Sequence, residues 1–251
     1  MKFIAIIPAR YASTRFPGKP LAMLGDKPVV QWVYERAAQV FDTVLVATDD
    51  TRILDAVHAF GGAAVMTSPD HRSGTDRVRE AYRLSGSDAD VIVNIQGDEP
   101  FVDPEQLRAL AGCFDDPATD IATLVRPFRG NYEELADPNK VKAVLTDGGF
   151  AMYFSRSVIP YVRGSELAEW PALAPYYVHI GLYGYRSDVL ERVASMPPSV
   201  LERAESLEQL RWLQAGLRIR AAESDITTVG IDTPADLEEA RRLISNNHER
   251  S

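Results

Sequence analysis

The regular alternation of short apolar runs with segments of helical periodicity limits the possible folds of this chain more than any other feature. Residues 2–8, "KFIAIIP", form a continuous apolar run, which is typical of a strand buried on both faces of a parallel sheet. Similar runs follow at 43–50, 63–66 and 90–100, and they alternate with helical segments at 28–41, 51–61, 75–86 and 104–114. Strands and helices that alternate through short connections predict a doubly wound parallel α/β sheet.

The pattern changes after residue 120, where short strand candidates follow one another with few helices between them. They lie at 121–127, 141–146, 150–155 and 177–185, and residues 163–175 read as a loop. A helix at 201–215, strands at 218–222 and 226–231 and a helix at 234–245 close the chain. We therefore expect one Rossmann-like domain over residues 1–251, with antiparallel hairpins inserted as a smaller subregion at 120–190.

Charge and composition exclude several classes of protein. The net charge of −9 argues against a surface for nucleic acid or for anionic membranes. The apolar run at the N-terminus, residues 3–7, is too short for a signal peptide or a membrane span, so we expect a soluble cytoplasmic protein. The single cysteine, Cys113, excludes an intrachain disulfide and a cysteine-cluster metal site, and its apolar surroundings predict a buried thiol.

A basic loop follows the first strand, against the acidic balance of the whole chain. The stretch "AIIPARYASTRFPGKPL", residues 5–21, contains Arg10, Arg15 and Lys19 beside Gly18. It matches neither a Walker A loop nor a G-x-G-x-x-G fingerprint. The loop is either a solvated turn or a site for a polyphosphate, which guanidinium and ammonium groups bind and which glycine lets approach the backbone.

Three further motifs follow predicted strands, and all would open on the same edge of the sheet. They are "SPDHRSGTDR" at 68–77, "QGDEP" at 96–100 and "GIDTP" at 230–234. Ligands of open parallel sheets bind beyond the carboxyl ends of the strands, so this shared edge is the predicted site. Ser73 with Asp76 fits the capping box of a helix, and Ser73 with the Gly74 backbone could also read the edge of a base.

Two aspartates at this edge are candidate metal ligands. Asp98 follows a buried strand, where a lone carboxylate is costly unless it is solvated, paired or bound to a metal; a plain Gly-Asp turn is the alternative. Thr233 and Asp236 fit the N-cap and N3 positions of the last helix, whereas Asp232 is not needed for that cap. Neither motif contains a lysine partner, so Asp98 and Asp232 are predicted to bind Mg²⁺ together with phosphate oxygens and water. The four histidines lack zinc-type spacing.

The motifs, taken in order, resemble those of a known enzyme family. "IIPARYASTRFPGKPL", "ATDD", "HRSGTDR", "VNIQGDEP", "YFSR", "HIGLYGY", "ESLEQLR" and "GIDTPADL" are similar to the 3-deoxy-manno-octulosonate (Kdo) cytidylyltransferases of lipopolysaccharide biosynthesis, over about residues 2–243. The resemblance implies a nucleotide-diphospho-sugar transferase fold, the reaction of CTP with Kdo to CMP-Kdo and diphosphate, a Mg²⁺ cofactor and a homodimer. The chain departs from the family at Val178, where a basic residue is usual, and in a shorter loop at 163–175.

The resemblance also implies roles for individual residues. The catalytic residues would be Asp98, Asp232, Lys19 and Arg10, with Asp98 and Asp232 as metal ligands. The nucleotide would contact Ala9, Arg10, Arg15, Lys19, Arg72, Ser73, Gly74, Arg77, Gln96 and Asp98. The sugar would contact Gln96, Arg156, His179, Tyr183, Glu208 and Gln209.

The residues themselves support the sugar assignment only in part. In a strand, "HIGLY" places His179, Gly181 and Tyr183 on one face, although a hairpin with a wet face explains the same alternation. Arg156 can bind a carboxylate through two parallel hydrogen bonds, and Glu208 and Gln209 interrupt a leucine-lined helix.

Two other functions stay open at this point. One is a cytidylyltransferase for a related acid sugar, such as a sialic acid or an amino analogue of Kdo. The other is a CTP-binding regulator without turnover, against which the intact pair Asp98 and Asp232 argues. The sequence shows no Ser/His/Asp triad and no reactive cysteine, which agrees with direct displacement at the α-phosphorus.

Overall fold

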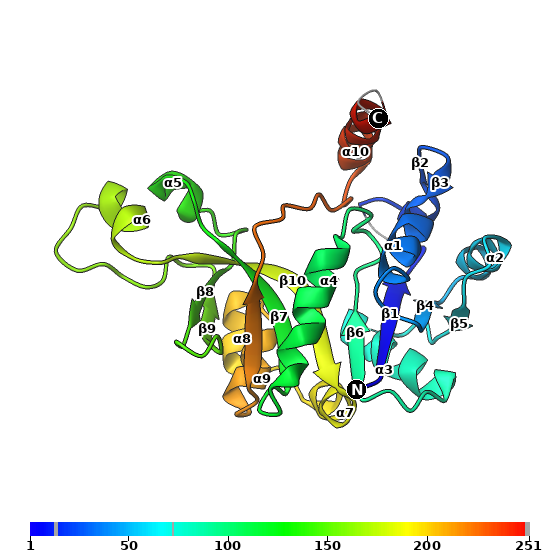
Figure 1. The fold of residues 1–251 in the computed structure, drawn as a ribbon, viewed down its shortest axis with the longest axis horizontal. Helices are drawn as coiled ribbons and strands as arrows, with labels where there is room; N and C mark the ends of the chain where they lie inside the picture. The colour runs from blue at the N-terminus through cyan, green and yellow to red at the C-terminus, as the bar shows by residue number, and fades with distance from the viewer. Residues whose placement is uncertain (13–14, 72, 249–251) are drawn as a thin grey trace. The chain divides into compact units, whose positions relative to one another are not determined.

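The structure, a computed structural model, describes residues 1–12, 15–71 and 73–248, which fold into two compact units (Figure 1). The first unit consists of Met1–Leu107 and the C-terminal segment from Thr227, and the second is Arg108–Ile226. The subregion predicted at 120–190 lies inside the second unit.

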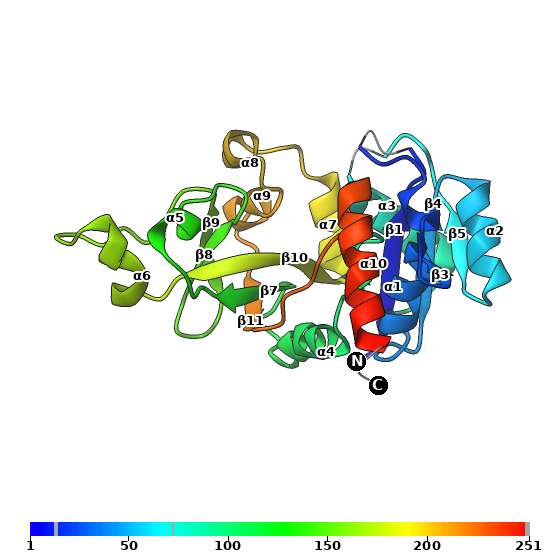
Figure 2. The same cartoon turned by 90° about the horizontal axis from the view of Figure 1, so that it is seen from above.

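The first unit contains a parallel sheet whose strands lie in the order β6-β1-β4-β5. Its strands are β1 (Phe3–Ala9), β4 (Val44–Thr48), β5 (Ala64–Met66) and β6 (Val91–Asn94), and a small hairpin joins β2 (Met23–Leu24) to β3 (Lys27–Pro28). Its helices are α1 (Val29–Ala37), α2 (Thr51–Ala59), α3 (Gly74–Ser85), α10 (Pro234–His248) and the 3-10 helix η1 (Lys19–Leu21). Figure 2 shows α1 and α3 on opposite faces of β1, which confirms the doubly wound arrangement.

The order of the strands fixes where a ligand can bind. The chain moves from β1 through α1 to β4 on one side, and it returns through α3 to β6 on the other side of β1. The carboxyl ends of β1 and β6 therefore lie at the point where the winding reverses, which is where open α/β sheets bind their ligands.

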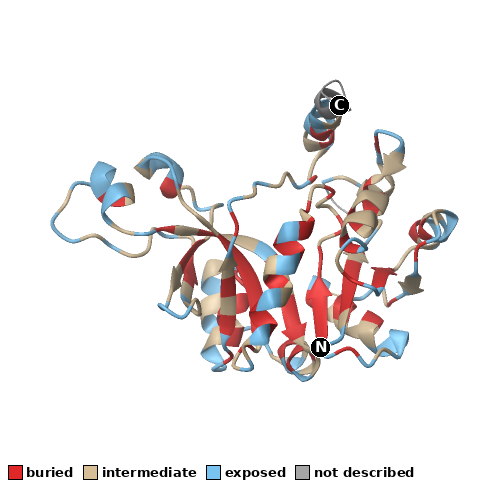
Figure 3. Cartoon of the chain, viewed as in Figure 1, coloured by how far each residue is buried: buried red, intermediate tan, exposed pale blue. Residues whose placement is uncertain are grey.

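Local sequence explains most of these elements. Ile4, Ala5, Ile6 and Ile7 of β1 are at most 1% exposed, as the central strand of a covered sheet requires (Figure 3). Helix α3 ends at Gly86, which adopts the left-handed conformation with φ 63°, a backbone geometry that glycine adopts without steric cost.

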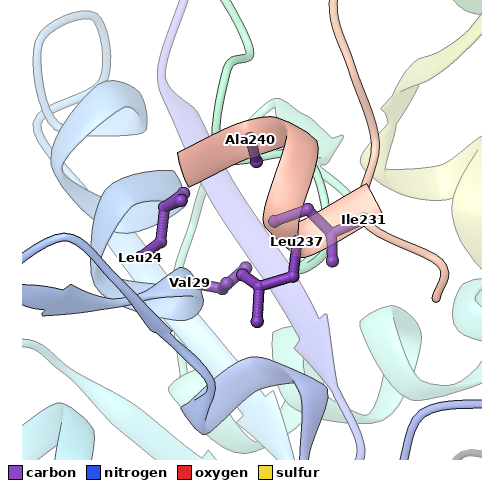
Figure 4. Close-up of a cluster of buried hydrophobic side chains, with 5 residues drawn as sticks. All are labelled: Leu24, Val29, Ile231, Leu237 and Ala240. Carbon is purple, nitrogen blue, oxygen red and sulfur yellow. The ribbon is translucent and has the colours of Figure 1, made fainter. Parts of the chain in front are cut away.

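The last helix returns to the first unit and packs against its N-terminal part. Leu237 and Ala240 of α10, with Ile231 before it, form a buried cluster with Leu24 and Val29 (Figure 4). This packing positions the segment before α10, and with it Asp232, beside the loops of the N-terminal strands.

The second unit contains the mixed part of the sheet. Strand β7 (Ile121–Pro127) lies between the parallel β11 (Ile219–Glu223) and the antiparallel β10 (Tyr177–Arg186), and β8 (Lys142–Leu145) pairs antiparallel with both β10 and β9 (Ala151–Ser155). These pairings confirm the predicted antiparallel hairpins. The helices are α5 (Tyr132–Leu135), α6 (Trp170–Leu173), α7 (Ser187–Ser195), α8 (Val200–Glu205), α9 (Gln209–Gln214), η2 (Cys113–Asp115) and η3 (Leu167–Glu169), and α4 (Pro104–Gly112) spans the boundary between the units.

Three local predictions are wrong. Residues 226–231 form no strand: the Ile226 N–H donates to the Ser224 hydroxyl and the Ile231 N–H to the Asp98 carbonyl, and neither contact belongs to a strand ladder. The helix expected at 201–215 is two helices, α8 and α9, separated by Ser206 in the left-handed conformation with φ 53°. The loop expected at 163–175 contains η3 and α6, and α7 was not expected.

Two observations bear on the exclusions drawn from the sequence. Cys113 is buried as predicted, and burial raises the pKa of its thiol to about 11. None of the helices in the described residues combines the length and the apolar character that crossing a bilayer demands.

Candidate active site

A cleft of about 230 Å³ opens in the first unit at the carboxyl ends of β1 and β6. Its lining includes all the predicted nucleotide-binding residues that the structure describes: Ala9, Arg10, Arg15, Lys19, Ser73, Gly74, Arg77, Gln96 and Asp98. Arg72, also predicted, lies outside the described residues. Asp232 completes the lining from the segment before α10, so the structure brings together the four motifs that follow predicted strands.

The floor of the cleft is formed by two loops whose backbones nearly touch. A Cβ atom on Gly97 would lie 2.7 Å from the carbonyl oxygen of Pro8, a distance that real Cβ atoms essentially never show. Only glycine lets the loop after β6 approach the loop after β1 this closely. The Gly-Asp dipeptide therefore determines where the Asp98 carboxylate lies.

The basic loop is anchored at its two ends. Gly18, with φ 72°, donates its backbone N–H to the carbonyl of Tyr11, and the Arg52 guanidinium lies 3.4 Å from the centre of the Tyr11 ring. Asp50 holds that guanidinium in turn, at 2.6 Å from Nη2. These contacts show how the loop is held beside the cleft by side chains that do not line it.

Lys19 joins the two aspartates. Its Nζ lies 2.5 Å from an oxygen of Asp98 and 3.3 Å from an oxygen of Asp232, and its side chain is 12% exposed. Arg15 adds an ion pair of 3.2 Å to Asp232. The sequence found no lysine partner inside either aspartate motif, and the structure supplies one from the basic loop, 79 residues before Asp98.

The two carboxylates can also hold a metal ion. Because Asp98 and Asp232 both reach one ammonium group, their oxygens converge on one point, and carboxylate oxygens are ligands that Mg²⁺ prefers. No cluster of three or more His, Cys, Asp or Glu ligands occurs among the residues described. The remaining ligands of an ion here would have to be phosphate oxygens and water, as Mg²⁺ sites in nucleotide enzymes use.

Two neighbouring motifs also cap helices. The Ser73 hydroxyl accepts a hydrogen bond from the backbone N–H of Asp76 and so caps α3. Thr233 and Asp236 cap α10 reciprocally, and the backbone N–H groups of Asp232 and Thr233 hold the pKa of the Asp236 carboxyl below its ordinary value. The predicted N-caps Ser73 and Thr233 are confirmed, the reciprocal bond is present at α10, and the Asp232 carboxylate is left out of the cap as expected.

Arg77 lines the cleft but is committed to structural partners. It is 4% exposed, and its two terminal nitrogens donate to Thr67 Oγ1 at 2.6 Å and to Asp49 at 2.7 Å. This guanidinium fixes α3 to the ends of β4 and β5. Its contact with a nucleotide stays a prediction.

Two residues at the site were not singled out from the sequence. His71 lines the cleft and contacts Glu80, whose carboxylate also accepts the backbone N–H of Ser68 at 2.8 Å. Burial, together with the charge of Asp98, raises the pKa of Glu99 to about 7. Both lie within quoted motifs, but nothing in their spacing distinguishes them from ordinary loop residues.

The predicted sugar residues divide between the units. Gln96 lies in the first unit, where its side chain donates to Asn94 at 3.3 Å. The other predicted residues belong to the second unit: Arg156, His179, Tyr183, Glu208 and Gln209.

His179 and Tyr183 lie together, as the strand period predicts. Their rings are 5.4 Å apart, although the pairing of β10 with β7 shifts between Ile180 and Tyr183. The imidazole also lies 2.9 Å from the Thr123 hydroxyl and contacts the Phe154 ring. Burial lowers the pKa of His179 to about 4, so the ring is neutral at neutral pH.

This neutral imidazole predicts a dependence of stability on pH. Below pH 6.5 the unfolded chain gains a proton on His179 that the folded protein does not accept, so stability falls as the pH drops from about 6.5 to 4. The slope from this group reaches about 1.4 kcal/mol per pH unit. Chemical denaturation between pH 7 and 4.5 measures it, and His179→Gln is expected to flatten the curve. An unchanged slope in that variant would contradict the prediction.

Glu208 and Gln209 do not lie inside one helix as expected. Gln209 is the first residue of α9 and is 4% exposed, whereas Glu208 precedes the helix and contacts Arg211. The charged partner of Glu208, three residues away, explains how this carboxylate is tolerated beside the buried Leu207.

Comparison with known proteins places the chain in a family. A profile described as cytidylyltransferase matches residues 4–219. A 3-deoxy-manno-octulosonate cytidylyltransferase of Parabacteroides distasonis is 57% identical over 249 residues, which cover 98% of this chain and 99% of that protein. One of Bacteroides thetaiotaomicron is 56% identical over 248 residues, 98% and 99% of the two chains. This chain belongs to the 3-deoxy-manno-octulosonate cytidylyltransferase family.

A solved structure extends the family relation to three dimensions. The structure of a CMP:2-keto-3-deoxy-manno-octonic acid synthetase complexed with CTP superimposes with a TM-score of 0.89 at 47% identity, over 98% of this chain and all of that one. A cytidylyltransferase of Leptospira borgpetersenii, at 17% identity and a TM-score of 0.64, shares the fold. The predicted α/β nucleotidyltransferase fold is thereby confirmed for this member of the Kdo cytidylyltransferase family.

Proposed function

We propose that this nucleotidyltransferase transfers CMP from CTP to the anomeric hydroxyl of Kdo and releases diphosphate, as a step of lipopolysaccharide biosynthesis. The observation that carries the proposal is the cleft of the first unit, where three basic side chains and two converging carboxylates meet at the switch point of the sheet. The family relation and the CTP in a relative 47% identical in sequence support CTP as the nucleotide.

The charges of the cleft fit a triphosphate. Arg10 and Arg15 are exposed, so their guanidinium groups are open to phosphate oxygens, and Lys19 adds a point charge. Once phosphates enter, Lys19 has anionic partners other than Asp98 and Asp232. Binding of the triphosphate through this loop would orient the α-phosphorus toward the attacking oxygen and neutralise the leaving diphosphate.

Asp98 and Asp232 would hold Mg²⁺ in the proposed reaction. When bound, the ion supplies charge stabilisation at the α-phosphate and lowers the pKa of a coordinated hydroxyl. The chain's own part is to fix the two carboxylates: Gly97 sets the position of Asp98, and the capped start of α10 sets that of Asp232. Cleavage of the bond from the α-phosphorus to the bridging oxygen then needs no covalent enzyme intermediate.

Cytosine would lie against the start of α3, next to Ser73 and the Gly74 backbone, and the contact of Arg72 stays a prediction from the sequence. A slot of backbone and short polar groups rejects purines by size and reads the exocyclic amine by hydrogen bonds. In the second unit the acid sugar would contact Arg156, His179, Tyr183, Glu208 and Gln209, and the contact of Gln96 stays a prediction from the sequence.

The two nucleotide subsites can be separated by substitution. Ser73→Ala is expected to change the ratio of CTP to UTP affinity, whereas Arg15→Ala weakens both nucleotides alike, by about tenfold for one charged contact. Isothermal titration with each nucleotide measures the four affinities. Ser73→Ala also removes the cap of α3, at about 1 kcal/mol, so Ser73→Thr, which keeps a hydroxyl cap, serves as the control. The reverse pattern would show that the subsites are exchanged.

A diphosphate-release assay with a panel of sugars tests the proposed function. The protein is incubated with CTP, Mg²⁺ and, in separate reactions, Kdo, an amino analogue of Kdo, a sialic acid or no sugar. Release is expected with Kdo above all others, and UTP in place of CTP serves as the nucleotide control. If diphosphate release is faster with another acid sugar, that sugar is the substrate and the Kdo assignment is wrong. If the protein binds CTP but releases no diphosphate with any sugar, it is a regulator.

We also propose that the enzyme is a cytoplasmic homodimer. Support comes from apolar side chains that the second unit leaves exposed: Tyr161 is 74%, Leu167 49% and Leu173 58% exposed. Leu167 lies in η3 and Leu173 in α6, and the Tyr161 ring contacts the ring of the buried Trp170 at 4.7 Å. Light scattering of the purified protein gives the oligomeric state, and a monomer at micromolar concentration would contradict the dimer.

A further inference from the structure

Glu205 joins two segments of the second unit that are far apart in sequence. It is the last residue of α8, and its carboxylate accepts the Ser155 hydroxyl at 2.6 Å on one oxygen and the Arg156 backbone N–H at 2.8 Å on the other. Its own backbone carbonyl accepts Arg156 Nε at 2.6 Å. Three hydrogen bonds therefore connect this one residue to the end of β9.

The contacts of the Arg156 guanidinium within the protein leave some of its N–H groups for a ligand. Nη1 donates to the carbonyl of Pro138 at 2.9 Å, and Nη2 lies 3.4 Å from the carbonyl of Ser206. A guanidinium has five N–H donors, so these contacts, with the one from Nε, leave one donor on each terminal nitrogen. Each of these donors can hydrogen-bond one oxygen of a carboxylate.

A buried lysine, Lys142, lies beside the end of β9, to which Glu205 is hydrogen-bonded. Lys142 is opposite Ser155 in the β8–β9 pairing and is fully buried, and its ammonium donates to the carbonyl of Asp137 at 2.9 Å. Burial lowers the pKa of Lys142, while the nearby charges of Asp137 and Glu205 raise it. The charge of the Glu205 carboxylate thus acts on the Lys142 ammonium, while its hydrogen bonds go to the Ser155 hydroxyl and the Arg156 backbone.

A left-handed turn directly follows Glu205. Ser206 adopts the left-handed conformation, Leu207 is buried, and Glu208 and Gln209 begin α9 directly afterwards. Glu205 therefore connects two segments that carry residues predicted for the acid sugar. Arg156 lies on one segment, and Glu208 and Gln209 lie on the other.

We propose that Glu205 is a positioning residue for Arg156. Its carboxylate fixes the backbone of Arg156 and the neighbouring Ser155, and its backbone carbonyl accepts Arg156 Nε, so that the guanidinium is ready for the carboxylate of the acid sugar. The inference rests on the function proposed above. A free arginine side chain loses rotamer entropy when a ligand orders it, and hydrogen bonds formed in advance remove part of that cost at binding. Glu205 itself does not touch the sugar in this proposal, because both of its carboxylate oxygens are engaged by Ser155 and Arg156.

The test begins with the wild-type enzyme, whose turnover of CTP and Kdo checks the proposed function by itself. Glu205→Ala keeps the backbone carbonyl that accepts Arg156 Nε and removes the carboxylate that fixes the Arg156 backbone and Ser155. The arginine is then held less firmly, which is expected to raise the KM for Kdo about tenfold, with kcat and the KM for CTP within twofold of wild type. Glu205→Gln keeps the shape but only one acceptor oxygen, so its effect should be intermediate. Glu133→Gln, an exposed glutamate of the same unit, is the matched control and should leave all constants unchanged.

A double-mutant cycle separates positioning from general loss of structure. In an Arg156→Ala background, Glu205→Ala should change the KM for Kdo by less than twofold, because the residue through which Glu205 acts is gone. A tenfold effect in that background, or an equal rise in the KM for CTP, would overturn the proposal.

Folding is monitored by thermal unfolding. If Glu205→Ala does not fold, Ser155→Ala takes its place in the cycle, because it removes one of the two donors to the carboxylate. A rise of about threefold in the KM for Kdo that disappears in the Arg156→Ala background supports the proposal. An unchanged KM for Kdo overturns it. If wild type turns over Kdo and the Glu205 variants keep the wild-type KM for Kdo, only the positioning role is refuted. If wild type does not turn over Kdo, the proposed function is refuted.

Discussion

Asp98→Asn is expected to lower kcat at least about a hundredfold, since one preorganised charge at a developing transition state contributes that much or more. The substitution keeps the shape of the side chain and removes the charge that faces Lys19 at 2.5 Å and that would hold Mg²⁺. Because the loss is in kcat, it should persist at saturating CTP and Kdo. Raising the Mg²⁺ concentration should recover only part of the lost kcat. Steady-state diphosphate release over a range of Mg²⁺ concentrations measures both effects.

Asp232→Asn should behave in the same way, because the two carboxylates reach the same ammonium group. Asp42→Asn, an exposed aspartate of the same unit outside the cleft, is the control and should turn over normally. Unfolding temperatures within a few degrees of wild type would show that the fold is kept. Normal turnover of Asp98→Asn at low Mg²⁺ would remove this residue from the catalytic role.

Arg156→Ala should raise the KM for Kdo by about one to two orders of magnitude and leave CTP affinity nearly unchanged. A hydrogen bond to a charged group contributes about 1.5–3 kcal/mol, and the variant loses the fork that would bind the sugar carboxylate. Kinetics with Kdo as the varied substrate and calorimetry with CTP measure the two quantities separately.

The same substitution also removes contacts within the protein, so its effect on folding needs its own control. Arg156 donates to the carbonyls of Pro138 and Glu205, and the alanine variant should unfold at a lower temperature. Arg156→Lys keeps the charge but cannot form two parallel hydrogen bonds. We expect it to keep more stability than alanine while still losing Kdo affinity. A fall in CTP affinity instead would place Arg156 outside the sugar site.

Where the fold follows from local chemistry, the sequence predicts it well. The bounds of β7 match the strand predicted at 121–127, and α3 begins at its predicted cap and ends at Gly86. The single break between α8 and α9 was missed, because Ser206 adopts a left-handed conformation without the glycine that usually marks one. Only the packing of its neighbours, such as the buried Leu207, selects that conformation.

The sequence predicted the edge of the sheet at which the candidate site lies, but not the contacts between its side chains. The topology of a doubly wound sheet brings the loops after β1 and β6 together, so their motifs could be placed at one edge in advance. The ion pair of Lys19 with Asp98 joins residues 79 positions apart, and the Glu205 contacts with Arg156 join residues 49 apart. No spacing rule applies over such separations, since they depend on how elements pack.

The ammonium of Lys19 lies between the two carboxylates, and this makes it a competitor for the ion they are proposed to bind. Mg²⁺ on its own would have to displace a partner that lies within 3.3 Å of both. A triphosphate changes the balance, because it offers Lys19 a new anionic partner and offers the ion further oxygens. Metal and nucleotide then strengthen each other's binding by the same factor, as linkage requires. The enzyme would take up its substrate and its ion as one complex, and Lys19 would be the exchangeable counterion that couples the two.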